Sequence, residues 1–222
     1  RSEIIAAISL DGQTDVIHVE IFDSDPRITV FDGLREFSEA TAQLKLETSC
    51  RSMRYINALL DGPIKDLKPD WIFIDGSERL KEFAEMQMRA NNHCAPFEGF
   101  ANRNLWKERN MYMNDIDHKA ATIAKKGVIY TAYVEIKEVT TATGQISREE
   151  PKWAGDIEQK VRIVIRVSSE VSLNGRDFCA LVESSKTKVV PTAGKRVVGS
   201  VDKLGNFEIL GFKTLFRGDM KL

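Results

Sequence analysis

The sequence predicts a single α+β domain in which an N-terminal strand and helices pack on a mostly antiparallel sheet formed largely by the C-terminal third. Apolar residues recur at helical spacing through much of the first half, and β-rich runs separated by turn residues fill the last third. The chain has 222 residues, of which 42% are hydrophobic and 29% charged. This composition is typical of a globular protein and argues against a disordered chain or a disulfide mini-scaffold.

In the first half, residues 16–22 alternate between polar and apolar side chains, with Ile17, Val19 and Ile21 on one face. This alternation predicts a half-buried strand. Pro26 closes the strand because proline cannot donate to the hydrogen-bond ladder. The other elements expected in this half are helices over 34–44, 53–60 and 77–90, with Asp32 as the N-cap of the first, and a short strand over 71–74.

In the second half, residues 91–114 have no clear period and predict a long irregular loop, whereas Ile116, Ala120 and Ile123 predict a short helix. Asn174-Gly175 is a strong signal for a hairpin turn. The other predictions are a strand over 128–136, a polar insertion or flexible loop over 140–156, a strand over 159–167, and a terminal hairpin over 196–216.

Charge is distributed unevenly along the chain. Residues 1–100 carry 11 Lys+Arg against 18 Asp+Glu, and residues 101–222 carry 21 against 15, for a net charge of −1. The two halves therefore predict either head-to-tail attraction between copies or a basic face turned toward a polyanion, although two solvated faces explain them equally well. The three widely spaced cysteines predict a reduced chain with no structural disulfide.

The sharpest enzymatic hypothesis is a metal-dependent PD-(D/E)xK-like nuclease. Asp70 follows Pro69, and Glu135 and Lys137 lie on a predicted strand, so two carboxylates and a lysine are available for Mg²⁺. Acid-x-Lys triplets occur six times in the sequence, which weakens this signal. No glycine-rich phosphate loop, zinc-ligand spacing or serine-nucleophile motif occurs, so no catalytic residue, metal or cofactor is expected.

Basic residues interleave with aromatic residues around Trp106, which favours binding of single-stranded nucleic acid, other phosphates or anionic lipid. The alternative is that the aromatic rings fill the core and the charges are solvated. The candidate residues for polyanion or partner binding are Arg103, Trp106, Lys107, Arg109, Lys119, Lys125, Lys126, Lys186, Lys188, Lys195 and Arg196.

Three stretches, covering about half the chain, resemble rhabdovirus matrix proteins. They are the strand, Pro-containing turn and helices over 16–62, the strand pair containing 165–168 and 175–179, and the terminal hairpin over 198–210. The chain departs from that family in its insertion at 140–156 and in lacking a basic N-terminal tail. The resemblance implies a non-enzymatic viral structural protein that self-assembles into a lattice, condenses the nucleocapsid and links it to the membrane during budding.

Three functions remain open on this basis: the assembly protein, a nucleic-acid-binding module without catalysis, and the nuclease. The partners expected with the first are further copies of the chain, nucleocapsid or nucleic acid, and a peripheral membrane contact. No apolar run reaches the roughly 18 residues that span a bilayer, and no secretion signal precedes the domain. The expected location is therefore the virion and the host-cell cytoplasm, including the inner face of a membrane.

Overall fold

The computed structural model describes residues 3–34, 37–97, 99, 104–141, 144–152, 157–186 and 195–211. The chain divides into two compact units, residues 1–155 and 156–222. Each unit has a sheet of its own, and the two are described separately.

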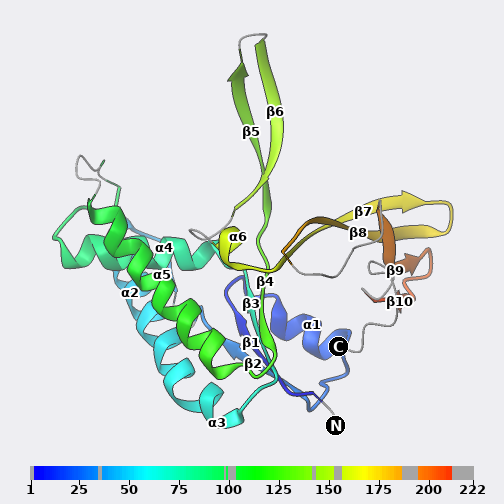
Figure 1. Cartoon of the computed structure of the whole chain (residues 1–222), viewed down its shortest axis with the longest axis horizontal. Coiled ribbons are helices and arrows are strands. Elements are labelled where there is room, and N and C mark those ends of the chain that lie inside the picture. The colour runs from blue at the N-terminus through cyan, green and yellow to red at the C-terminus, as the bar shows by residue number, and fades with distance from the viewer. Residues whose placement is uncertain are drawn as a thin grey trace. The chain divides into compact units, whose positions relative to one another are not determined.

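The first unit is built on a four-stranded parallel sheet (Figure 1). Its strands are β1 (Ile5–Ser9), β2 (Ile28–Asp32), β3 (Trp71–Asp75) and β4 (Gly127–Tyr130), in the order β2-β1-β3-β4. Strands β1 and β3 are short apolar runs whose side chains at Ile8, Ile72 and Ile74 are at most 1% exposed. Such continuous apolar runs are typical of parallel strands, because helices cover both faces of the sheet.

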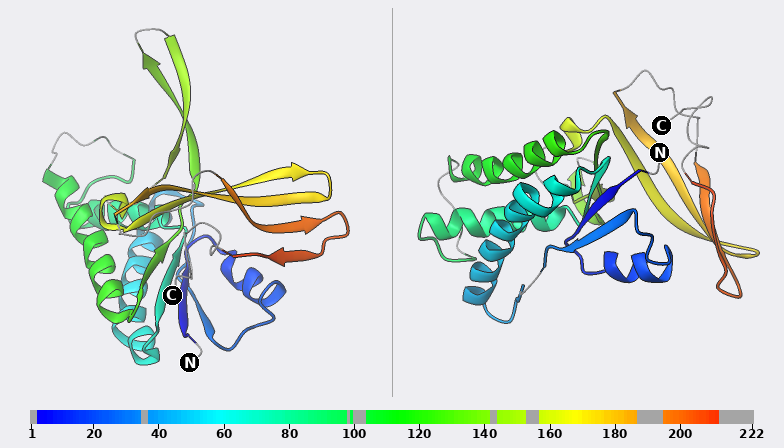
Figure 2. Two further views of the ribbon diagram at one scale, coloured as in Figure 1. Left: turned by 45° about the vertical axis from the view of Figure 1, so that its right-hand side comes forward. Right: turned by 90° about the horizontal axis from the view of Figure 1, so that it is seen from below.

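Helices connect the strands of the first unit. They are α1 (Thr14–Glu20), α2 (Ala42–Leu59), the π-helical turn η1 (Leu60–Ile64), α3 (Lys65–Leu67), α4 (Glu78–Asn91) and α5 (Asn104–Ile123). Helices α2, α4 and α5 lie together on one side of the sheet and α1 on the other (Figure 2). Right-handed crossovers require this division, because the chain moves one way from β1 to β2 and the opposite way from β2 to β3.

Beyond β4 the chain forms a two-stranded antiparallel ribbon of β5 (Val134–Thr141) and β6 (Gly144–Pro151), which projects from the parallel sheet (Figure 1). At its base the ribbon closes with a hydrogen bond between its two strands, which the Lys152 amide donates to the Tyr133 carbonyl at 2.8 Å. Residues 140–156, predicted as a polar insertion or flexible loop, thus include all of β6 and the end of β5.

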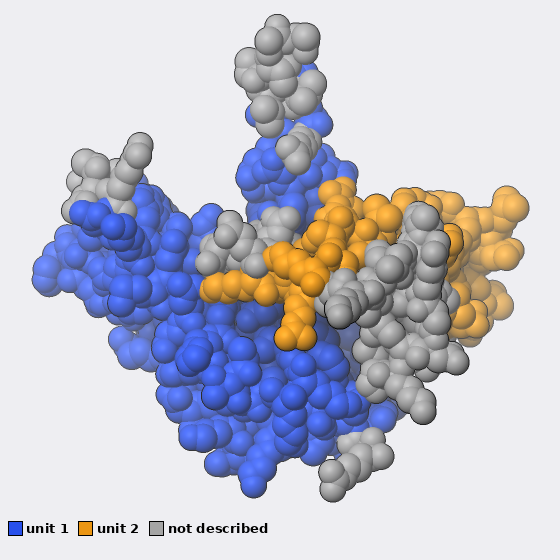
Figure 3. Space-filling view, viewed as in Figure 1, with its two compact units in different colours: residues 1–155 blue, residues 156–222 orange. Residues whose placement is uncertain are grey.

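The second unit, coloured orange in Figure 3, holds helix α6 (Ile157–Lys160) and a four-stranded antiparallel sheet. Its strands are β7 (Ile163–Ser172), β8 (Gly175–Ser185), β9 (Arg196–Asp202) and β10 (Phe207–Ile209), in the order β10-β9-β8-β7. Ala180 and Val198 form a small core with Ile165, Phe178 and Val182. The hairpin predicted at Asn174-Gly175 is confirmed. Strands β9 and β10 form the terminal hairpin predicted over 196–216, of which residues 212–216 lie outside the described residues.

The prediction of a mostly antiparallel main sheet is therefore right for the second unit and wrong for the first. Residues 16–22, predicted as a strand, lie largely in helix α1. The pattern misled because Val16, Ile17 and Val19 are 47%, 40% and 60% exposed, so their alternation reflects no buried strand face.

Two helices also lie elsewhere than predicted. Asp32 ends β2, and α2 begins only after Thr41, whose hydroxyl accepts from the Leu44 amide at 3.1 Å. Residues 104–114, expected in an irregular loop, form the first half of α5. The buried residues Met113, Ile116 and Ala120 of that helix follow a helical period that its polar first turns conceal.

Candidate functional site

The carboxyl edge of the parallel sheet is the candidate site of the first unit. The strand order places β1 between β2 and β3. The chain passes from β1 to β2 in one direction across the sheet, and from β2 to β3 and β4 in the other. In open α/β sheets, ligands bind in the crevice outside the carboxyl ends of the strands at such a switch point. Here the residues that follow β1, end β3 and follow β4 meet.

Asp75, the last residue of β3, lies at the centre of this edge. Its carboxylate accepts a hydrogen bond from the Thr14 hydroxyl at 2.8 Å and another from the Thr131 hydroxyl. Thr14 is the first residue of α1 and Thr131 follows β4, so two separate segments fix the carboxylate of Asp75. Such over-determined positioning is what a preorganised site requires.

Gly76 allows the turn after β3 to pass close to the turn after β1. Its φ is +79°, and a Cβ atom at this position would lie 3.3 Å from both the amide nitrogen and the Cβ of Asp11. The Gly76 amide donates to the Thr131 hydroxyl at 2.9 Å. A side chain at residue 76 would therefore push apart the two turns that carry Asp11 and Asp75.

Tyr133, at the base of the ribbon, joins the ribbon to this edge. Its hydroxyl donates to Asp11 Oδ2 at 3.1 Å. The pKa of Tyr133 is raised by partial burial, by this hydrogen bond and by the negative charges of Asp11, Asp75 and Glu78. The negative charges of three carboxylates thus act on the Tyr133 hydroxyl.

Glu78, the first residue of α4, is the third of these carboxylates. It accepts hydrogen bonds from its own backbone amide and from that of Tyr133, yet its Oε2 atom is buried without a hydrogen-bond partner. Burial raises the pKa of Glu78, and the charge of nearby Asp11 acts in the same direction, opposed by Arg79. A buried carboxylate oxygen without a partner is costly and rare in folded proteins.

A groove of about 970 Å³ adjoins this edge and is lined by Asp11, Glu78 and Tyr133 together with the outer face of α4 and the base of the ribbon. Lys137 and Lys152 of the ribbon base also line it. Its volume lies at the upper end of the range for small-molecule sites. The groove is therefore large enough for a nucleotide-sized ligand.

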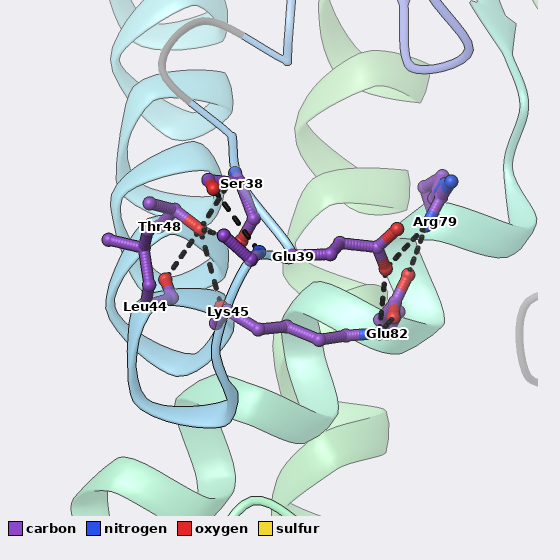
Figure 4. Close-up of polar contacts among 8 residues, drawn as sticks. Ser38, Glu39, Leu44, Lys45, Thr48, Arg79 and Glu82 are labelled. Carbon is purple, nitrogen blue, oxygen red and sulfur yellow. Dashed lines mark hydrogen bonds and ion pairs between the residues drawn. The ribbon is translucent and has the colours of Figure 1, made fainter.

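One wall of the groove is held by the ion-pair network shown in Figure 4. Lys45 of α2 pairs with Glu82 of α4 and with Glu39, which lies in the segment before α2. Arg79 pairs with Glu82 at 2.7 Å. The network ties this segment to α4, and four charges are largely satisfied by one another.

Within the first unit, the described residues that were predicted to bind a polyanion lie in separate places. Trp106, Lys107 and Arg109 lie near the start of α5, where the Arg109 guanidinium stacks 4.4 Å from the centre of the Trp106 ring. Lys107 is exposed, whereas only 14% of the Arg109 side chain is exposed, within 4.0 Å of Glu85. Arg109 thus packs within the helical layer.

The other predicted basic residues of the first unit have partners within it. Lys119 Nζ donates to Asn57 at 2.7 Å and to Asp61 at 2.9 Å. Lys125 donates to the Lys68 carbonyl, and Lys126 pairs with Glu3. These contacts lie by η1 and at the amino edge of the sheet.

In the second unit, Lys195 pairs with Glu170, Arg196 begins β9 and Lys186 follows β8. Arg103 and Lys188 lie outside the described residues. Polyanion binding by these side chains stays a prediction.

The nuclease site is not formed. Asp70 precedes β3 and accepts from the Ile4 amide at 3.0 Å, at the amino edge of the sheet. Glu135 begins the ribbon beyond the opposite edge and pairs with Lys137 at 3.2 Å. The amino edge, where Asp70 lies, and the carboxyl edge are separated by the five residues of β3, a distance of roughly 16 Å. Among the described residues, no three His, Cys, Asp or Glu side chains lie together so as to hold a metal ion.

The sequence predictions missed the residues at the carboxyl edge. The signal was present in two apolar runs, residues 4–8 and 71–74, of which the first is followed two residues later by Asp11-Gly12 and the second directly by Asp75-Gly76. These two Asp-Gly pairs indicate a shared site only if the two runs are neighbouring parallel strands. The sequence alone does not show that they are.

No protein-family model and no curated protein matches this sequence. Among solved structures, the chain is similar to a KaiC-like protein from the hyperthermophilic archaeon Pyrococcus horikoshii, with a TM-score of 0.46 and 12% identity. The similarity covers 93% of this chain and 75% of the other. A likeness at this level assigns the chain neither to that protein's family nor to its activity.

The expectation that the chain is a rhabdovirus matrix protein is wrong. The resemblance implied one domain with a mostly antiparallel sheet, whereas the first unit folds around a parallel sheet. The expectations of a lattice-forming, nucleocapsid-condensing virion component without enzymatic activity fall with it. No helix in the described ranges is long and apolar enough to cross a membrane.

Proposed function

We propose that the first unit is an enzyme domain that binds a phosphate-bearing small molecule, of the nucleoside triphosphate type, as its magnesium complex. The observation that supports this proposal is the position of Asp75 at the switch point of the parallel sheet, with its carboxylate fixed by two threonine hydroxyls.

The charges around Asp75 favour a ligand that brings its own cation. The hydrogen bonds reported for Asp11 and Asp75 come from hydroxyls and one backbone amide. Mg²⁺ is usually held by one or two carboxylates together with substrate phosphates, so three protein carboxylates are not needed. Asp75 is the carboxylate that would meet the cation.

The groove favours phosphate for the rest of the ligand. Lys137 and Lys152 lie on its ribbon side, where both pair with Glu135, and a bound phosphate would take the place of that carboxylate. A free phosphate chain without a cation would instead be repelled by Asp11, Asp75 and Glu78. The proposal therefore requires binding that depends on magnesium.

The test is calorimetric titration of the whole chain with ATP, GTP and inorganic triphosphate, with Mg²⁺ and with EDTA. We expect binding only with Mg²⁺, and a 10- to 100-fold loss of affinity in Asp75→Asn, as for the loss of a charged hydrogen-bonding group. Asp70→Asn, at the other end of the same strand, is the matched control and should bind as the wild type does. Absence of binding by all three ligands, or equal affinity in Asp75→Asn, would reject the proposal.

A further inference from the structure

The groove beside the carboxyl edge continues along the outer face of α4. Glu78 lines it next to the proposed cation and phosphate site, and Arg89, near the other end of the same helix, lines it too. At about 1.5 Å per residue, the helix carries the groove roughly 16 Å from Glu78 to Arg89. This distance is comparable with the length of an extended nucleoside triphosphate from its terminal phosphate to its base. The far end of the groove is therefore where the base of such a ligand would lie.

Phe97 lines this far end and is 70% exposed. The turn that carries Phe97 is anchored to α4. Arg89, only 6% exposed, pairs with Glu85 at 2.9 Å and donates to the Ala95 carbonyl at 2.7 Å. The Cys94 amide donates to the Arg89 carbonyl at 2.9 Å. A fixed backbone thus holds an open aromatic ring in the groove, and a ligand that covers the ring removes a large apolar surface from water.

Tyr133 also lines the groove and is 57% exposed, but it lies at the phosphate end. Its hydroxyl donates to Asp11 Oδ2 at 3.1 Å, beside the carboxylates of the proposed cation site. A ligand whose phosphates lie near Asp75 therefore has Tyr133 beside its phosphate chain and Phe97 beside its base.

We propose that Phe97 stacks on the base of the bound nucleotide, so that the ligand of this site is a nucleoside triphosphate and not a bare phosphate chain. The inference rests on the proposed function, since it defines the ligand of the same groove more narrowly. Every nucleobase has a π face, and stacking on an aromatic side chain adds affinity without selecting one base over another. The phenyl ring has no hydrogen-bonding group with which to read the edge of a base.

The test is calorimetric titration of the whole chain with Mg·ATP, Mg·CTP and magnesium triphosphate. In the wild type we expect both nucleotides to bind about 5- to 100-fold more tightly than triphosphate, as expected for stacking of one base. Phe97→Ala should lose this difference while its affinity for triphosphate stays unchanged. Phe97→Trp keeps an aromatic ring and should keep the difference. Because Phe97 is largely exposed, both variants are expected to fold.

The matched control is Phe22→Ala. Phe22 is 42% exposed and follows α1, which lies on the other side of the parallel sheet from α4 (Figure 2). Its removal should leave the affinities for nucleotides and for triphosphate unchanged.

The outcomes also separate the two proposals. Equal affinity of the wild type for ATP and triphosphate, or unchanged ATP affinity in Phe97→Ala, overturns the role of Phe97 and leaves the binding proposal intact. A loss in Phe97→Ala that affects triphosphate as strongly as ATP also overturns that role, because the ring then acts on the whole site and not on the base. Absence of binding of all three ligands by the wild type overturns the binding proposal, and the role of Phe97 with it.

Discussion

Strand β3 has an aspartate at each end, Asp70 just before it and Asp75 as its last residue. The carboxylates at the two edges of the parallel sheet have different kinds of partner. At the amino edge, Glu3 pairs with Lys126 and accepts from the Trp71 indole at 2.8 Å, while Asp70 accepts from the Ile4 amide. The hydrogen bond from Lys126, followed by that from Trp71, lowers the pKa of Glu3. These contacts join the chain's first residues to β3 and to the segment before β4.

At the carboxyl edge, threonine and tyrosine hydroxyls take the place of the lysine. Asp75 and Asp11 accept from such hydroxyls, and Glu78 keeps a buried oxygen without a partner and a raised pKa. The amino edge thus cancels its negative charge with a cation of the same chain, and the carboxyl edge positions its charge without cancelling it. This difference supports the ligand site that we propose at the carboxyl edge.

The largest effect on stability is expected from Thr131→Val. The Thr131 hydroxyl donates to Asp75 and accepts from the Gly76 amide at 2.9 Å, so its loss leaves two groups without partners. We expect the free energy of unfolding to fall by about 2–3 kcal/mol, measured by urea denaturation. Thr122→Val on α5 removes a hydroxyl that bonds only within its own helix and should change stability by less than about 0.5 kcal/mol. Equal effects of the two variants would show that the carboxyl edge is not a tightly fixed network.

Gly76→Ala should have the next largest effect. The left-handed φ of residue 76 costs an alanine about 1–2 kcal/mol, and the added methyl group would also crowd Asp11. Gly12 on the same edge has a φ of +77°, but its nearest neighbour to an added Cβ is 3.9 Å away, so Gly12→Ala isolates the conformational cost. Denaturation of both variants measures the difference. If Gly12→Ala is as destabilising as Gly76→Ala, the close approach of the two turns contributes nothing.

Asp70→Ala tests the amino edge. Removal of the carboxylate leaves the Ile4 amide without its acceptor, and we expect a loss of about 1 kcal/mol in the free energy of unfolding. Affinity for Mg·ATP should be unchanged, because Asp70 lies at the opposite end of β3 from Asp75. Thermal denaturation and the calorimetric titration measure the two quantities. A loss of affinity comparable to that of Asp75→Asn would contradict the division of roles between the edges.

Sequence patterns predicted the parts of the fold that depend on local contacts. The hairpin at Asn174-Gly175 could be predicted because the turn residues alone select it. The parallel sheet could not, because β1 and β3 are continuous apolar runs that pair although their residues lie 66 apart in the sequence, as Ile5 and Trp71 do. The error over α1 has the same cause. A strand over residues 16–22 excludes the helix that a parallel connection from β1 to β2 requires.

The candidate site was missed for a related reason. Asp75-Gly76 could be recognised as the end of a strand, but Thr14 and Thr131 reach these two residues from 55 to 61 positions away, and Tyr133 reaches Asp11 from 122 positions away. These residues form no motif in the sequence and become neighbours only through the strand order β2-β1-β3-β4. The basic residues around Trp106 drew attention because they are close in sequence, although the structure gives most of those it describes a partner within the chain.

The smallest effect, and the most specific to the carboxyl edge, is the pH dependence of stability at Glu78. Because its pKa is raised in the folded chain, the folded state binds more protons than the unfolded state between the usual and the raised pKa. Stability therefore falls as pH rises through that window, and the cost persists above it. Glutamine does not titrate, so Glu78→Gln should gain about 1–3 °C in Tm relative to the wild type between pH 4 and pH 7.5. Glu3→Gln should change in the opposite direction, since the pKa of Glu3 is lowered. If Tm changes with pH in the same direction in both variants, the two edges do not differ electrostatically as described.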